Sequence, residues 1–96
     1  MSERRKLQDI IEVVKKGIEI RDLAITLAML ENLAKEDGVY VKLKGKDVLA
    51  LCYETLPYEA GYQVAVILRN GIAVVYDIFR DRDGYVDRVQ VYIRRV

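Results

Sequence analysis

The chain has 96 residues, 52% of them hydrophobic and 32% charged, and its 16 Lys and Arg against 15 Asp and Glu leave a net charge of +1. This balance is typical of a single globular domain over residues 1–96, and the longest apolar stretches, such as 25–30, are far shorter than the roughly 20 residues of a membrane-spanning helix. Because there is one cysteine and no signal-peptide core, we expect a cytoplasmic protein without disulfides or membrane association, in which polyanion binding depends on how the charges are distributed.

Helical periodicity occupies the first third of the sequence. Apolar residues recur at spacings of three and four from Glu3 to about Lys16, which predicts an amphipathic helix. Gly17 interrupts the pattern, and a second helical run continues to Ala34 before Gly38 provides a stop signal. The sequence therefore predicts two helices, or one bent helix.

After Gly38 the hydrophobic period changes to two, and β-branched and aromatic residues become frequent, as in antiparallel strands. The predicted strands run near residues 39–43, 47–53, 61–69, 72–79 and 85–96. We expect tight hairpin turns, each with a pair of positive-φ residues, at Asn70-Gly71 and Asp83-Gly84, and a surface flap at 54–60. The predicted fold is α+β, with two N-terminal helices packed on a four- to five-stranded antiparallel meander sheet.

The alternation of side chains in the first and last predicted strands suggests a function. In both strands, valine, leucine or isoleucine alternates with basic residues and a tyrosine. Single-stranded nucleic acids are bound by cations that contact phosphates and by flat rings on which bases stack, each stack contributing about 1 to 3 kcal/mol. We therefore predict a sequence-tolerant binder of single-stranded DNA, or of RNA. The expected phosphate ligands are Lys42, Lys44, Arg88 and Arg94, and the expected stacking residues are Tyr40, Tyr58 and Tyr92.

A purely structural role for the basic and aromatic residues also fits the sequence. Tyrosine and lysine are common on any solvated strand face, where lysine also protects edge strands from aggregation.

Tyr53, Tyr58 and Tyr62 are close in sequence near the flap and could line a cleft beside the sheet.

The central predicted strands are apolar on both faces. In 47–53, Val48, Ala50 and Cys52 alternate with further apolar residues, and 61–69 and 72–79 behave similarly. Because a large apolar surface is hard to keep soluble on a monomer, we expect a second subunit to cover one face, giving a homodimer or higher oligomer. Cys52 is then expected to be a buried structural thiol.

The sequence favours binding over catalysis. It has no histidine, which is the commonest general base and metal ligand, and no glycine-rich phosphate loop. Asp77, Asp81 and Asp83 resemble part of a calcium loop, but their spacing lacks the remaining ligands. A plain hairpin accounts for the three aspartates better, so we expect no metal. Because histidine and a phosphate loop are both missing, we also expect no enzyme activity and no cofactor.

The chain resembles the archaeal ThermoDBP-related single-stranded DNA-binding proteins. The likeness covers most of the chain and lies in the helical N-terminus, the Val-rich strands, a composition typical of hyperthermophile proteins, and the residue types at Tyr40, Lys42, Lys44, Arg88, Tyr92 and Arg94. The resemblance implies a hydrophobic and aromatic cleft, flanked by basic residues, that binds single strands with little sequence preference. The sequence departs from the family by ending at Val96 after the last predicted strand, so we expect no C-terminal leucine zipper of the kind that dimerises the longer members.

Two further functions are compatible with the sequence. In a protein-interaction or homo-oligomeric assembly module, the apolar faces of the sheet would meet other subunits and the charges would only solubilise the chain. In a winged-helix-like binder of duplex DNA, residues 21–38 would break into two helices and 42–46 would form the wing.

Overall fold

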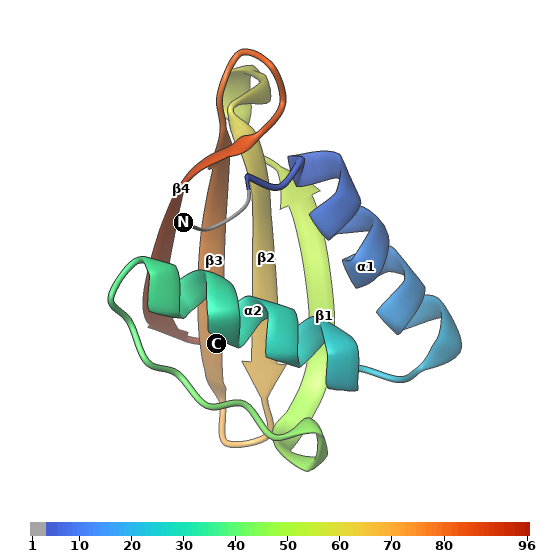
Figure 1. Cartoon of the computed structure of the whole chain (residues 1–96). Coiled ribbons are helices and arrows are strands. Elements are labelled where there is room, and N and C mark those ends of the chain that lie inside the picture. Colours follow the sequence, from blue (N-terminus) through green and yellow to red (C-terminus); the bar gives the residue numbers. More distant parts are fainter. Residues whose placement is uncertain (1–3) are drawn as a thin grey trace.

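Two helices precede four strands in the computed structural model, which describes residues 4–96 (Figure 1). Neither helix of this described part is long and apolar enough to cross a membrane. The helices are α1 (Leu7–Ile20) and α2 (Ala24–Glu36), and the strands are β1 (Val48–Thr55), β2 (Gly61–Leu68), β3 (Ile72–Arg80) and β4 (Val86–Arg95). Short 3-10 turns occur at Gly45–Asp47 and Pro57–Glu59.

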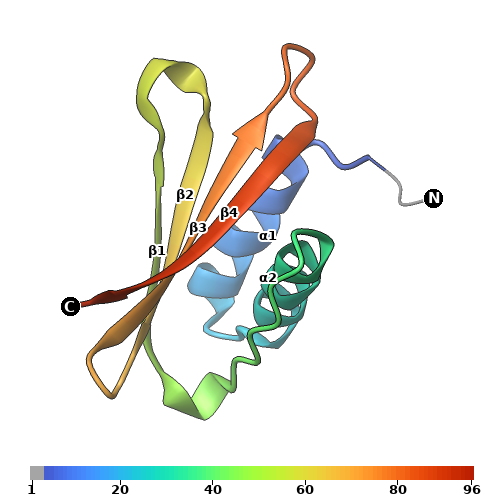
Figure 2. The same cartoon turned by 90° about the vertical axis from the view of Figure 1, so that its left-hand side faces the viewer.

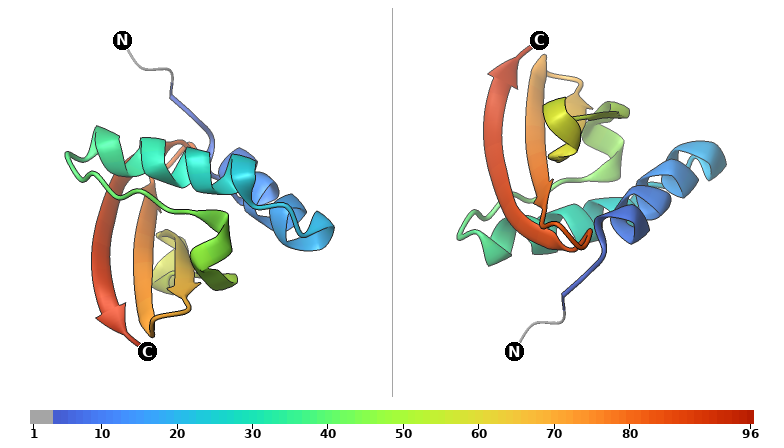
Figure 3. Two further views of the ribbon diagram at one scale, coloured as in Figure 1. Left: turned by 90° about the horizontal axis from the view of Figure 1, so that it is seen from below. Right: turned by 90° about the horizontal axis from the view of Figure 1, so that it is seen from above.

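The strands form one antiparallel meander in the order β1-β2-β3-β4. Both helices lie on the same side of this curved sheet (Figure 3). The apolar stripe of each helix is buried against the inward-facing residues of the central strands. The fully buried members are Ile11, Val14, Leu30, Ala34, Val64, Val66, Tyr76 and Ile78. The predicted α+β fold is confirmed, with four strands.

The two helices are separate, but the break is not at the predicted glycine. Gly17 lies inside α1, where a Cβ would overlap the Thr26 hydroxyl of α2, so glycine here permits close helix packing. The helix ends at Ile20 and is capped by Arg21, whose backbone is left-handed with φ of 57° and whose N–H donates to the Gly17 carbonyl. The described part of α1 begins at Leu7, and the predicted start at Glu3 lies outside the described residues.

Residues 39–44 are extended but form no strand, so the first predicted strand is wrong. Their alternation is present, because Leu43 is buried and Val39 and Val41 are half-buried against the core. The Leu43 N–H, however, donates to Glu31 Oε1 at 2.9 Å and not to a neighbouring strand. An extended segment that packs on a core shows the same period of two as a strand in a sheet.

Both predicted hairpins are present, with a different turn geometry. Gly71 and Gly84 have φ of 85° and 90°, whereas Asn70 and Asp83 are not in the positive-φ region. The Gly71 N–H donates to the Leu68 carbonyl at 3.1 Å, and the Gly84 N–H donates to the Asp81 carbonyl at 3.2 Å. Only the glycine of each pair needs the left-handed conformation, so the predicted positive-φ pairs are wrong.

The segment before α1 is attached to the β3–β4 turn by backbone hydrogen bonds. The Leu7 N–H donates to the Gly84 carbonyl at 2.9 Å, and the Val86 N–H donates to the Arg5 carbonyl at 2.8 Å. The Arg4 side chain also pairs with Asp81 and lies over the Tyr85 ring. The first helix is thereby joined to the last hairpin.

Candidate nucleic-acid interface

No segment within residues 4–96 covers the face of the sheet opposite the helices (Figure 2). Its side chains are most exposed on β1 and β4, whereas Ala73 and Val75 of β3 are buried. Alternate residues of each strand point to this side, and the pairing registers align them in rows across the sheet. We call this surface the outer face. Its residues are Ala50, Cys52 and Glu54 of β1, Gln63, Ala65 and Ile67 of β2, Ala73, Val75, Asp77 and Phe79 of β3, and Arg88, Gln90, Tyr92 and Arg94 of β4.

The chemistry of the outer face changes from one edge to the other. On β1 and β2 it is made of small or apolar side chains together with Gln63, and Glu54 is the charged residue of this half. On β4 it carries two arginines, a glutamine and a tyrosine. The half of the outer face near β4 is therefore the part suited to an anionic, aromatic ligand.

Tyr92 lies across β3 on the outer face. It pairs with Val75 in register, yet its hydroxyl accepts a hydrogen bond at 3.1 Å from Gln63 Nε2 of β2, which also donates to Asp77 Oδ1 at 2.9 Å. Val75 beneath the ring is only 3% exposed, while Tyr92 itself is 36% exposed. Burial against the sheet and the Asp77 carboxylate raise the pKa of Tyr92. An anchored ring with an exposed face can stack on an unpaired base.

Two arginines lie on either side of Tyr92 along β4. The guanidinium carbon of Arg88 lies 4.5 Å from the centroid of the Phe79 ring, its partner in register, in a cation–π contact. Arg94 is exposed and pairs with Ala73. At about 3.3 Å per residue, Arg88 lies about 13 Å from Tyr92 and Arg94 about 7 Å from it along the strand. The structure thus brings together three of the predicted site residues on one exposed face.

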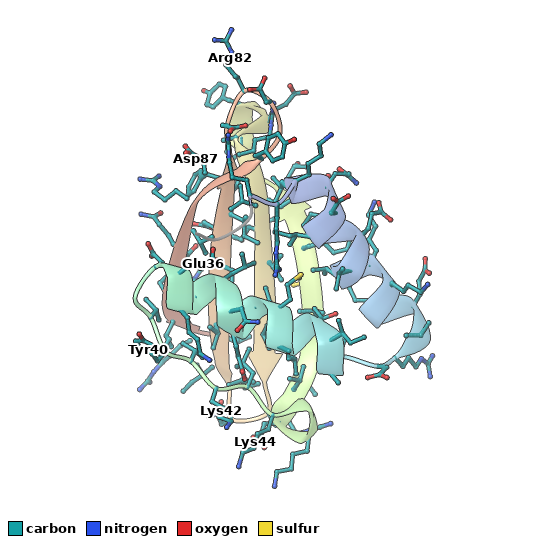
Figure 4. The ribbon with its side chains drawn as sticks, in the orientation of Figure 1. Glu36, Tyr40, Lys42, Lys44, Arg82 and Asp87 are labelled. Carbon is teal, nitrogen blue, oxygen red and sulfur yellow. The ribbon has the colours of Figure 1, made fainter. Side chains whose placement is uncertain are left out.

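The other predicted site residues come from loops. Tyr40, Lys42 and Lys44 are exposed on the extended segment after α2, and the two lysines lie at the end of the sheet where β4 ends (Figure 4). Tyr58 is fully exposed in the flap at the opposite end, where β1 joins β2. The prediction that Tyr40, Lys42 and Lys44 lie on a strand face is therefore wrong, although their exposure is as expected.

The tyrosines near the flap do not form a common cleft. Tyr53 and Tyr62 contact each other, with ring centroids 6.4 Å apart, on the face of the sheet that the helices cover. Tyr58 projects from the 3-10 turn with φ of 59° and packs on neither. The predicted clustering of these three residues is wrong, because Tyr53 and Tyr62 belong to the core side.

Cys52 is exposed on the outer face, with its Sγ 3.9 Å from the Ala65 carbonyl oxygen. The prediction of a buried thiol is therefore wrong. It followed from the apolar residues on both sides of β1, but the second side has no covering layer in residues 4–96.

Two of the three aspartates near the last hairpin, Asp77 and Asp81, make structural hydrogen bonds with their carboxylates. Asp81 Oδ1 accepts hydrogen bonds from the N–H groups of Asp83 at 2.9 Å and Tyr85 at 3.0 Å. These bonds, led by that from Tyr85, lower the pKa of the Asp81 carboxyl. Asp77 accepts from Gln63 instead. The Asp81 carboxylate thus stabilises the turn, as expected for a plain hairpin, and the Asp77 carboxylate stabilises the outer face.

Gln63 and Phe79 are parts of the site that were not predicted. Gln63 anchors the Tyr92 ring and Phe79 supports Arg88. One feature of the sequence could have indicated Gln63. It is a polar residue in an otherwise apolar stretch, and it points to the same face of the strand as Ala65 and Ile67.

Comparisons of the chain with protein-family models, with curated proteins and with solved structures find no match. The function is therefore inferred from the geometry of the outer face and from the residues that form it.

Proposed function

We propose that this protein binds single-stranded DNA or RNA with little sequence preference through the β4 half of the outer face. The observation that carries the proposal is the anchored, exposed ring of Tyr92 between Arg88 and Arg94. Stacking tolerates any sequence because every base has a flat π-face, and arginines contact phosphates without reading the base.

The proposed roles divide between the sheet and the loops. Tyr92 stacks on a base, and Arg88 and Arg94 contact the flanking phosphates. Lys42 and Lys44 add phosphate contacts from the extended segment. Tyr40 and Tyr58 are further stacking residues, of which Tyr58 can be reached only by a strand that runs to the flap end of the sheet. On the basis of the same basic and aromatic residues, we also propose that the protein is related to the ThermoDBP-related single-stranded DNA-binding proteins.

Fluorescence anisotropy with labelled single-stranded DNA, single-stranded RNA and duplex DNA tests this function. We expect binding to single strands with a slope of log affinity against log salt near −3, as for about four neutralised phosphates. Tyr92→Ala should weaken binding by about 5- to 150-fold, which corresponds to one lost stack of about 1 to 3 kcal/mol. Ile25→Ala, which truncates an exposed apolar side chain on α2 outside the outer face, is the control. A flat salt response, or a preference for duplex, would contradict the proposal.

We also propose that the chain forms a homodimer through the edge of β1. This strand contains no lysine, arginine or proline, and Leu49 on it is 61% exposed. The other edge, β4, carries Arg88, Arg94 and Arg95, which discourage strand pairing. An edge without basic residues can pair with its own copy in antiparallel fashion about a two-fold axis. Sedimentation over a range of concentrations measures the association.

We also propose that the protein is located in the cytoplasm. An exposed thiol such as Cys52 stays reduced in that compartment, whereas an oxidising one would promote cross-linking between chains. Localisation by fractionation of the source cells tests it.

A further inference from the structure

One end of the sheet carries six exposed cationic side chains from three segments of the chain. We call this surface the basic end, and it consists of Lys42, Lys44, Lys46, Arg69, Arg94 and Arg95. None of the six forms an ion pair with another described residue, since the pairs present are Arg4–Asp81 and Lys15–Glu12. In the segments 42–48, 67–72 and 93–96 that form this end, Asp47 is the one acidic side chain. A positive surface of this kind is suited to a polyanion.

Backbone hydrogen bonds fix the three segments relative to one another. Arg69, in the β2–β3 turn, donates from its N–H to the Asp47 carbonyl at 2.9 Å and from its Nε to the Lys46 carbonyl at 3.1 Å. The Val96 N–H donates to the Gly71 carbonyl at 2.9 Å, next to the pairing of Arg95 with Ile72. These hydrogen bonds hold the backbone segments that carry the six cations in fixed positions relative to one another.

The basic end is continuous with the outer face through Arg94. This residue is two positions beyond Tyr92 on β4 and points to the same side of the sheet. At the opposite end of the molecule, acidic and basic side chains are mixed: Arg4 pairs with Asp81, and Arg82 and Asp87 lie in the same region (Figure 4). A phosphate chain that leaves Tyr92 thus meets Arg88 and then mixed charges in one direction and, in the other, a cluster of cations that form no ion pair with the described residues.

We propose that a single strand stacked on Tyr92 continues past Arg94 onto the basic end, where Lys46, Arg69 and Arg95 contact its phosphates. The ligand is the sugar–phosphate backbone of single-stranded DNA or RNA, and the inference rests on the proposed function. It adds a direction along β4 and a dependence of affinity on strand length. Each phosphate contact adds about −0.7 to the salt slope, so three contacts add about −2 for strands long enough to reach them.

The test compares short strands of about five nucleotides with long strands of about fifteen, which lie near the two ends of the range of site sizes of single-strand-binding domains. Anisotropy is measured with the wild type, with the triple variant Lys46→Gln/Arg69→Gln/Arg95→Gln, and with the charge-matched control Lys16→Gln/Lys35→Gln/Arg82→Gln. The control residues are exposed and lie outside both surfaces. Circular dichroism checks that all three proteins fold.

For long strands, we expect the triple variant to have a salt slope shallower than that of the wild type and the control by about 2, while short strands bind all three alike. Equal slopes in all three proteins with the long strand, together with weaker binding by Tyr92→Ala, would overturn this inference and leave the proposed function intact. An equal loss for short and long strands in the triple variant would also overturn it. If the wild type binds no single strand of either length, the proposed function itself is wrong.

Discussion

Tyr76 of β3 is fully buried, and its hydroxyl has no hydrogen-bond partner among the described residues. A buried hydroxyl without a partner costs about 1 to 3 kcal/mol of stability. We therefore expect Tyr76→Phe to raise the free energy of unfolding, measured by urea denaturation, by about 1 kcal/mol. Tyr92→Phe is the matched control, because it loses the hydrogen bond with Gln63 and should lower the same quantity by about 0.5 to 1 kcal/mol. A loss of stability in Tyr76→Phe would show that this hydroxyl has a partner in solution.

The same residue predicts a response to alkaline pH. Burial, and next the Glu31 carboxylate, raise the pKa of Tyr76 from 10.0 to about 12. Because the folded pKa is above the unfolded one, ionisation of this hydroxyl favours the unfolded state, so stability is unaffected below pH 10 and falls as pH rises through 12. Wild type should therefore lose about 2 kcal/mol more than Tyr76→Phe between these pH values, as measured by denaturant unfolding at each pH. Parallel pH profiles for the two proteins would contradict the raised pKa.

Part of the candidate site could be predicted residue by residue. The period of two in the last strand places Arg88, Tyr92 and Arg94 on one face, and the structure agrees. The contact between Tyr92 and Gln63 could not be predicted, because it depends on the registers of β2, β3 and β4 together. The exposure of Cys52 was missed for a related reason, since a pattern of apolar residues does not show which face a helix covers.

At the level of elements, the packing of α1 on α2 depends on Gly17. An alanine Cβ at this position would overlap Thr26 Oγ1 and lie 3.3 Å from the Asp22 carbonyl oxygen. Replacing glycine in an exposed helix normally stabilises it by about 1 kcal/mol. Here we expect Gly17→Ala to destabilise the fold by about 1 to 3 kcal/mol, because the added methyl group overpacks the contact.

Thermal and urea unfolding of Gly17→Ala, Thr26→Ala and the double variant measure this effect. The double variant should be more stable than the sum of the single changes predicts, since removing the Thr26 hydroxyl makes room for the methyl group. A stabilised Gly17→Ala protein would mean that the helices are farther apart than described.

The elements themselves were predicted best where local signals are strong. Glycines at the β2–β3 and β3–β4 turns and the changes in hydrophobic period located all four strands and both hairpins. The end of α1 was misplaced because Arg21 adopts the left-handed conformation that glycine usually supplies. Residues 39–44 were misassigned because nothing local distinguishes Glu31 as their hydrogen-bond partner from a neighbouring strand.

For the whole molecule, the two sheet edges predict how copies associate. Leu49→Lys places a charge on the proposed β1 interface and should shift a dimer towards monomer in sedimentation velocity experiments. Ile93→Lys adds the same charge to an exposed apolar position on β4 and should leave the association unchanged. A wild-type protein that is monomeric at all concentrations, or equal effects of the two changes, would contradict the β1 interface.

The attachment of the N-terminal segment to the last hairpin affects the order in which the chain can fold. Each ladder of the meander joins neighbouring strands, so the sheet can assemble by successive local hairpins, which form quickly. Leu7 and Arg5, by contrast, find their backbone partners at Gly84 and Val86, near the other end of the chain. During synthesis from the N-terminus, these two hydrogen bonds form only after the last hairpin has left the ribosome, and the apolar stripe of α1 stays partly uncovered until the strands it packs on have followed.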